Sequence, residues 1–212
     1  MLLIGMYDSP FVRRVAVTLK LLGLPFEHAN WSVGRDFERI REFNPLGRVP
    51  TLVLPDRTCL MESSAILDHL DELAGPARAL LPGSGPDRRQ ALNLIAMATG
   101  AAEKGVAQIY ERVFRPEDKR HQPWVERCRL QMSTALAALD RHVGERGESQ
   151  WLVGKRMTQA DITAACAFTF LNDALRVAAD RVMYQSLATL AARCESLPAF
   201  QETRLPFHAP NS

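Results

Sequence analysis

Hydroxyl donors at the start of a predicted helix are the first residues of the chain that could do chemistry. Ser9 follows an apolar run and precedes Pro10, a residue favoured at the first position of a helix. The Ser9 hydroxyl could donate a hydrogen bond to an anionic atom, which the partial positive charge of a helix N-terminus would also attract. An ordinary helix cap made by Ser9 or Asp8 is the alternative. Tyr7 is the second candidate donor, although we expect it to pack in the strand or line a pocket.

Glu62 and Ser63 form a second candidate site, at the start of another predicted helix. The apolar residues that follow have the spacing of one helix face: Ala65, Ile66, Leu67 and Leu70. Glu62 could pair with an ammonium group, and the free N–H groups around Ser63 could hold a carboxylate. Taken alone, the pair would be explained as a helix start with glutamate in the first turn. The residues upstream decide between these interpretations.

The segment before Glu62 has the pattern of a β-hairpin that begins at a proline. Residues 51–54 and 59–61 are short apolar runs typical of buried strands, and residues 55–58 form a turn. Pro50 cannot donate to a sheet ladder, so we expect it to have a local role. A cis Val49–Pro50 bond is one such role, and we predict it here.

The stretch 44–70 resembles the glutathione-binding segment of the cytosolic glutathione transferases. The family pattern appears in three pieces: Asn44-Pro45, Arg48-Val49-Pro50, and Glu62-Ser63 followed by Ala65-Ile66. No piece is specific alone, but all of them in this order and spacing give a strong signal. The N-terminal run resembles the serine-type members, such as plant tau-class, zeta-like and related bacterial proteins: Ser9-Pro10-Phe11-Val12, with Arg14-Val15.

The resemblance implies that Ser9 is the catalytic residue and donates to the sulfur of glutathione. Lowering a thiol pKa of about 8.5 by roughly two units requires about 2.7 kcal/mol. One charge-assisted hydrogen bond at about 1.5–3 kcal/mol and a helix terminus at about 0.3–1 kcal/mol are enough. Members with cysteine at this position exchange thiols, so serine favours conjugation.

The resemblance also implies which residues would hold the two substrates. Glu62 and Ser63 would bind the γ-glutamyl group, the Val49 backbone beside Pro50 would dock the cysteinyl unit as an added strand does, and Arg48 or Arg35 would reach the glycyl carboxylate. For each arginine a solvated side chain is the alternative. The second-substrate pocket would draw on aromatic residues, although apolar residues at helical spacing are usually core: Tyr7, Phe11, Tyr110, Phe114 and Phe168.

The predicted function is that of a glutathione transferase, which activates the thiol of its co-substrate glutathione to attack an electrophilic small molecule. A glutathione-dependent isomerase of the maleylacetoacetate type would use the same site. A non-catalytic interaction or regulatory protein of the same fold is the third interpretation, and the intact motif residues argue against it. The family pattern further implies detoxification and a homodimer. The sequence gives weak support for the dimer, because one helix has more apolar residues than a single buried face would accommodate: Leu94, Ile95, Met97 and Ala98.

Composition places this chain among ordinary globular proteins of a reducing compartment. It has 212 residues and a net charge of +2 with both signs interspersed, which gives no reason to expect nucleic acid or an anionic membrane as a partner. The cysteines are far apart without a CxxC spacing, which argues against a zinc site or a disulfide framework. We therefore expect no metal, mostly buried reduced thiols and a cytoplasmic location.

The element pattern changes after a Pro- and Gly-rich cluster at 82–86, which we interpret as a linker. Before it, strands at 2–7, 25–31, 51–54 and 59–61 alternate with helices at 10–22, 36–43 and 62–73. After it, only helices are predicted, at 87–115, 123–143, 158–176 and 184–194. The predicted fold is therefore α/β plus all-α, with a thioredoxin-like glutathione-binding domain at 1–82 and an all-helical domain at 83–212. Thr158 and Asp161 are expected to form a capping box with a role in folding.

Overall fold

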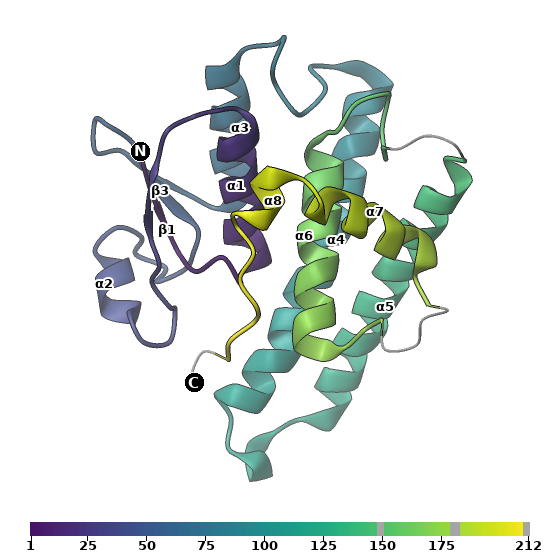
Figure 1. Ribbon diagram of the computed structural model, residues 1–212. Helices are drawn as coiled ribbons and strands as arrows, with labels where there is room; N and C mark the ends of the chain where they lie inside the picture. Colours follow the sequence, from purple (N-terminus) through teal and green to yellow (C-terminus); the bar gives the residue numbers. More distant parts are fainter. Residues whose placement is uncertain (148–150, 179–182, 210–212) are drawn as a thin grey trace. The chain divides into compact units, whose positions relative to one another are not determined.

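Four short strands at the N-terminal end of the chain form one sheet (Figure 1). They are β1 (Leu2–Ile4), β2 (Glu27–Ala29), β3 (Thr51–Val53) and β4 (Cys59–Met61). In the order β2-β1-β3-β4, strand β1 pairs parallel with β2 and antiparallel with β3, and β3 pairs antiparallel with β4. This computed structural model describes residues 1–147, 151–178 and 183–209. Strand β1 ends earlier than predicted because Gly5, with a φ of 129°, leaves the extended conformation.

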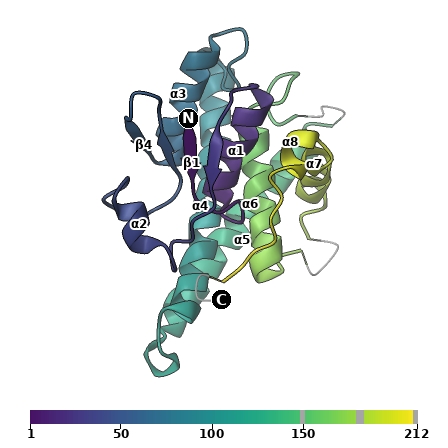
Figure 2. The same cartoon turned by 60° about the vertical axis from the view of Figure 1, so that its left-hand side comes forward.

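Helices α1 (Pro10–Leu21) and α3 (Ser63–Ala74) lie side by side on one face of this sheet, as Figures 1 and 2 show. The short helix α2 (Phe37–Arg41) lies between β2 and β3 in sequence. The core between sheet and helices is built from apolar residues at the expected helical and strand spacings: Leu3, Val12, Val15, Ala16, Leu19, Leu52, Ile66, Leu67 and Leu70. The predicted order β-α-β-α-β-β-α of a thioredoxin-like domain is confirmed.

The chain divides into two compact units, and the first of them includes the C-terminal segment. The first unit is Met1–Gly83 with Leu197–Ser212, and the second is Ser84–Ser196. We predicted that residues 83–212 form the helical domain, but helix α8 (Pro198–Gln201) packs against α1.

A buried arginine on α1 holds this C-terminal segment. Arg13 is 3% exposed, its Nε donates to the Thr203 carbonyl at 3.1 Å and its Nη2 donates to the Phe200 carbonyl at 3.0 Å. The Phe200 side chain is fully buried. Pro198 stands in the first turn of α8, a position that favours proline.

Among the described residues of the second unit, all the regular elements are helices. Its helices are α4 (Gly85–Val113), the short 3-10 helix η1 (Glu117–Lys119), α5 (Gln122–Glu145), α6 (Gln159–Leu175) and α7 (Gln185–Glu195). Helix α4 packs against α5 and α6, and α7 packs against both α5 and α6. The four predicted helices are therefore confirmed, whereas η1 and α8 were missed because each is a single turn.

The predicted capping box at the start of α6 is present. The Thr158 side chain accepts from the Ala160 N–H, and Asp161 Oδ2 accepts from the Thr158 N–H at 2.8 Å. Asp161 Oδ1 also accepts from the Leu152 N–H at 2.7 Å, so the carboxyl ties the preceding loop to the helix. Burial raises the pKa of Asp161, and these N–H donors oppose that shift. Asp161 is thus a folding residue, as predicted.

The cysteines follow the expected pattern of free thiols. Cys128, Cys166 and Cys194 are buried, and Cys59 is half-buried. Within the described ranges, no helix has both the length and the apolar character needed to cross a bilayer.

Candidate functional site

Ser9 caps helix α1 and still has a hydrogen to donate. Its Oγ accepts from the Val12 N–H at a long 3.4 Å, and its backbone is extended, as an N-cap residue requires. The cap uses a lone pair of the hydroxyl oxygen, whereas the O–H donor is a separate capacity of the same group. The structural and the catalytic interpretations of Ser9 are therefore compatible.

The loop that leads from β1 to Ser9 is held on two sides. The Tyr7 ring stacks on the His28 ring, with centroids 3.8 Å apart and planes 5° from parallel. Burial raises the pKa of the Tyr7 phenol, so Tyr7 keeps its proton. Asp8 Oδ2 accepts from the His208 N–H at 3.1 Å, which connects this loop to the C-terminal segment. Burial raises the pKa of Asp8, and the His208 contact opposes the shift.

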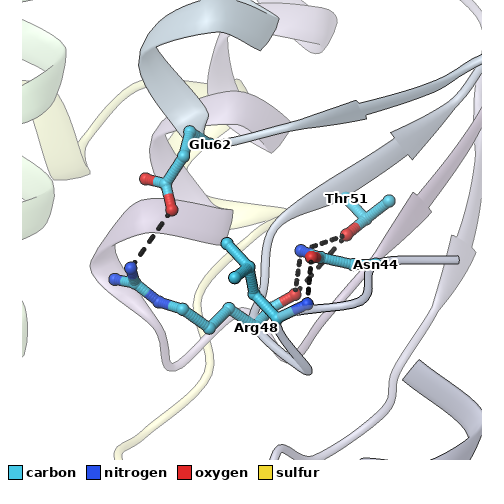
Figure 3. Close-up of polar contacts among 5 residues, drawn as sticks. Asn44, Arg48, Thr51 and Glu62 are labelled. Atoms are coloured by element: carbon cyan, nitrogen blue, oxygen red, sulfur yellow. Dashed lines mark hydrogen bonds and ion pairs between the residues drawn. The ribbon is translucent and has the colours of Figure 1, made fainter. Parts of the chain in front are cut away.

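A buried asparagine shapes the loop before β3 (Figure 3). The Asn44 side chain is almost fully buried; its Nδ2 donates to the Arg48 carbonyl at 2.9 Å and to Thr51 Oγ1 at 3.2 Å. Its Oδ1 accepts from the Leu46 N–H at 3.0 Å. One amide thus braces both ends of the loop 44–51. We predicted Asn44 only as part of a motif, and its positioning role becomes visible in the folded chain, where its amide reaches Arg48 and Thr51.

Val49 lies within this loop with its backbone polar groups available. The Val49–Pro50 bond is cis, as predicted. Strand β3 starts two residues later, and within the described part of the chain no hydrogen bond engages the Val49 N–H or C=O. An extended ligand could pair with these two groups as a strand pairs with a sheet edge.

The start of α3 combines a strained residue with an open helix end. Glu62 has φ 66° and ψ 126°, a conformation that costs a non-glycine residue about 1–3 kcal/mol and that occurs preferentially at functional sites. No side chain among the described residues caps the helix, and Ser63 at its first position is 4% exposed. The guanidinium of Arg14, itself 1% exposed, donates to Ser64 Oγ at 3.3 Å. A buried positive charge therefore reinforces the helix dipole where an anion would bind.

An ion pair connects the loop before β3 with the start of α3. Arg48 Nη1 lies 3.3 Å from Glu62 Oε1, and the two side chains are 60% and 56% exposed (Figure 3). Exposed pairs of this kind contribute about 0–1 kcal/mol. Charged groups of a ligand could therefore replace this pair at little cost.

The remaining predicted site residues lie elsewhere. Arg35 Nη2 lies 3.0 Å from Asp36 Oδ2, next to α2. Phe11 is half-buried on α1, whereas Tyr110 and Phe114 belong to the second unit, where their rings make an edge-to-face contact at 4.9 Å. Both of these rings are partly exposed, so their proposed place in a pocket stays a prediction.

One further aromatic candidate is a core residue. Phe168 on α6 is 5% exposed and packs edge-to-face against Tyr184. Its helical spacing reflects the interior of the second unit, the alternative that the sequence left open.

Comparison with known proteins identifies the family of this chain. Residues 3–78 match the glutathione S-transferase N-terminal domain, and residues 122–199 match the glutathione S-transferase C-terminal domain. The GST-like protein YibF of Escherichia coli K12 is 30% identical over 172 residues, which span 81% of this chain and 82% of that protein. A probable maleylacetoacetate isomerase of Vibrio cholerae is 26% identical over 95% of this chain and 94% of its own length.

The fold has also been seen with a bound ligand. A crystal structure of a glutathione S-transferase from Methylobacterium radiotolerans, in complex with glutathione sulfonate, superposes with a TM-score of 0.88. Its sequence is 31% identical to this one, and the match covers 98% of this chain and 95% of that chain. The chain belongs to the glutathione S-transferase family.

Proposed function

We propose that this protein is a glutathione transferase that binds glutathione on its first unit and stabilises the thiolate for attack on an electrophilic small molecule. Glu62 pairs with the γ-glutamyl ammonium, and the start of α3 at Ser63 holds the γ-glutamyl carboxylate. The Val49 backbone docks the cysteinyl unit. Arg48 reaches the glycyl carboxylate once the ligand separates it from Glu62. Arg35, which contacts Asp36, is the second candidate for that carboxylate.

The observation that carries this proposal is the uncapped start of α3 next to the unpaired backbone of Val49. Arg48 spans the two, since its chain neighbour is Val49 and its guanidinium contacts Glu62. A tripeptide with charged ends and an extended middle has groups that complement these protein groups. Its ammonium and two carboxylates would meet Glu62, the start of α3 and Arg48, and its middle residue has a free backbone edge for Val49. In a helix start that served only folding, an exposed arginine or a strained glutamate would not add to the stability of the fold.

Thiolate formation is assigned to Ser9 at the start of α1. The required shift of roughly two pKa units corresponds to about 2.7 kcal/mol. The hydroxyl hydrogen bond and the helix terminus together supply an amount of this size, at about 1.5–3 and 0.3–1 kcal/mol. Tyr7 is the second candidate donor, although its ring is already stacked on His28.

Replacement of Glu62 by alanine is expected to weaken glutathione binding roughly ten- to hundredfold, because one charge-assisted hydrogen bond of about 1.5–3 kcal/mol is lost. The ammonium that Glu62 pairs with is present before and after thiol activation, so the turnover number at saturation should change little. Calorimetric titration with glutathione measures the affinity directly.

Glu38→Ala is the matched control for this experiment. Glu38 is another exposed glutamate of the first unit, and its Oε2 lies 2.9 Å from Arg41 Nη1. We expect wild-type affinity in this variant. Equal affinities for wild type, Glu38→Ala and Glu62→Ala would refute the assignment of Glu62, and a wild type that binds no glutathione would refute the function itself.

Isomerisation of a maleyl-type acid is the second candidate function, favoured by the Vibrio cholerae relative. It would use the same glutathione site, so an experiment distinguishes the two activities by the second substrate that is turned over. Turnover of a reactive aryl halide without isomerisation of a maleyl acid supports conjugation, and the reverse result supports isomerisation. Retention on immobilised glutathione separates both from a non-catalytic protein of the same fold.

We also propose a homodimer, a cytoplasmic location and a role in detoxification. On α4, Leu94 and Ala98 are buried, whereas Ile95 and Met97 are half-buried and Leu92 is 45% exposed. This surplus of apolar surface would be covered in an isologous interface.

Sedimentation velocity should show a dimer at micromolar concentration, and Leu92→Glu should shift it towards the monomer. Leu130→Glu, on a leucine of α5 that is 67% exposed, is the control that leaves the dimer intact. A wild-type monomer would contradict the proposed assembly.

A further inference from the structure

Gly5 lies where three parts of the first unit meet. Its N–H donates to the Ala29 carbonyl on β2 at 3.0 Å. A Cβ atom at Gly5 would lie 2.6 Å from Val12 Cγ2 and 2.8 Å from Val49 Cβ. Gly5 is therefore packed directly against the helix that Ser9 caps and against the residue proposed to dock the cysteinyl unit.

His28 fixes the orientation of the peptide group that leaves Gly5. The His28 Nε2 atom lies 2.7 Å from the Gly5 carbonyl oxygen. A carbonyl oxygen only accepts, so the Nε2 atom carries the hydrogen and donates it. His28 itself is set by the sheet, because β2 pairs in register with β1 and places His28 opposite Leu3. The same ring also stacks on the Tyr7 ring.

We propose that His28 is a positioning residue for thiolate formation, acting through its hydrogen bond to the Gly5 carbonyl. This inference rests on the proposed function. The bond fixes the path of the loop between Gly5 and Ser9 and thereby the distance between the Ser9 hydroxyl and the Val49 backbone. His28 touches neither the sulfur nor the cysteinyl unit in this assignment.

The distance between the Ser9 hydroxyl and the Val49 backbone matters because glutathione would bind to both groups at once. The cysteinyl backbone docks at Val49, and its sulfur must then meet the Ser9 hydroxyl in hydrogen-bond geometry. A misplacement of about 1 Å at a reacting group can cost on the order of a hundredfold in rate. Between Gly5 and Ser9 the loop has one internal backbone bond in the described structure, from the Ser9 N–H to the Met6 carbonyl at 3.2 Å. The His28 contact is thus a main constraint on this loop.

Two variants separate the hydrogen bond from the ring. His28→Phe keeps an aromatic ring for Tyr7 to stack on and removes the donor, and phenylalanine is well accepted in a strand. His28→Gln removes the ring but places an amide N–H donor near the position of Nε2. For His28→Phe we expect the apparent thiol pKa of bound glutathione to rise and the turnover number to fall roughly three- to tenfold, with little change in glutathione affinity. In His28→Gln, both the thiol pKa and the turnover number should lie close to their wild-type values.

Hydrogen exchange on the free protein tests the same contact without any ligand. The Ser9 amide, which donates to the Met6 carbonyl, should exchange roughly three- to tenfold faster in His28→Phe than in wild type or His28→Gln. Unchanged loop exchange together with an unchanged pH profile in His28→Phe would overturn the proposal. So would equal impairment of both variants, because the hydrogen bond would then not be the cause. If wild type binds no glutathione, the proposed function fails, whereas the exchange result still decides whether His28 orders the loop.

Discussion

Replacement of Ser9 by alanine is expected to lower the turnover number about thirtyfold while glutathione affinity changes far less. The hydrogen bond from the Ser9 hydroxyl strengthens as the sulfur becomes anionic, so its loss falls on the activated state. A loss of about 2 kcal/mol there corresponds to a rate decrease of roughly thirtyfold. Steady-state kinetics with a reactive aryl halide, with glutathione varied, separate the effect on turnover from the effect on binding.

Two control variants distinguish the chemical role of Ser9 from its role as a helix cap. Ser9→Thr keeps both the hydroxyl and the cap, so it should retain most of the activity. Thr158→Ala removes a capping hydroxyl from α6, so it should lower stability by about 0.5–2 kcal/mol without changing the turnover of the folded protein. Unchanged turnover in Ser9→Ala would show that Ser9 is only a cap. A large loss in Tyr7→Phe would then assign the donor role to Tyr7.

Gly5→Ala is expected to have the second large effect, on stability and activity together. A methyl group would overlap Val12 and Val49, and φ at this position is 129°, which side chains disfavour. Overpacking costs typically about 1–3 kcal/mol, and a left-handed backbone conformation adds about 1–2 kcal/mol. Because the groups that must move include Val49, glutathione binding should weaken as well. Chemical denaturation measures the free energy of unfolding, and calorimetry measures glutathione binding.

Gly23→Ala separates the backbone effect from the packing effect. Gly23 also has a positive φ, 62°, but a Cβ there would meet no atom within 4 Å. This variant should lose about 1–2 kcal/mol of stability and keep wild-type affinity for glutathione. If Gly5→Ala were no worse than Gly23→Ala by both measurements, the close packing of Gly5 against Val12 and Val49 would not matter for the site.

The parts of the fold that the sequence predicted are those encoded by local patterns. The apolar spacing of α1 and α3, the hairpin after Pro50 and the capping box at Thr158 each depend on residues a few positions apart. The C-terminal segment was assigned to the wrong unit because its contact is made by Arg13, more than 180 positions away. An arginine among the apolar residues of α1 is the signal that could have suggested a distant carbonyl partner.

The candidate site divides in the same way. Ser9, Glu62 and Ser63 could be proposed from helix-start chemistry, and Val49 from the proline after it. The supporting contacts of Asn44 and His28 could not be proposed from the sequence, because they depend on which carbonyl oxygen lies opposite each side chain in the folded chain. The Arg48–Glu62 pair was likewise not predicted as a contact, although both residues were proposed to bind glutathione.

The ultraviolet thiolate band of bound glutathione, titrated with pH in the wild-type complex, tests the central claim most directly. We expect an apparent thiol pKa roughly two units below the free value of about 8.5, and a shift of this pKa back towards the free value in Ser9→Ala. A bound thiol that titrates near 8.5 in the wild-type protein would contradict thiolate stabilisation by this site, however tightly glutathione is bound.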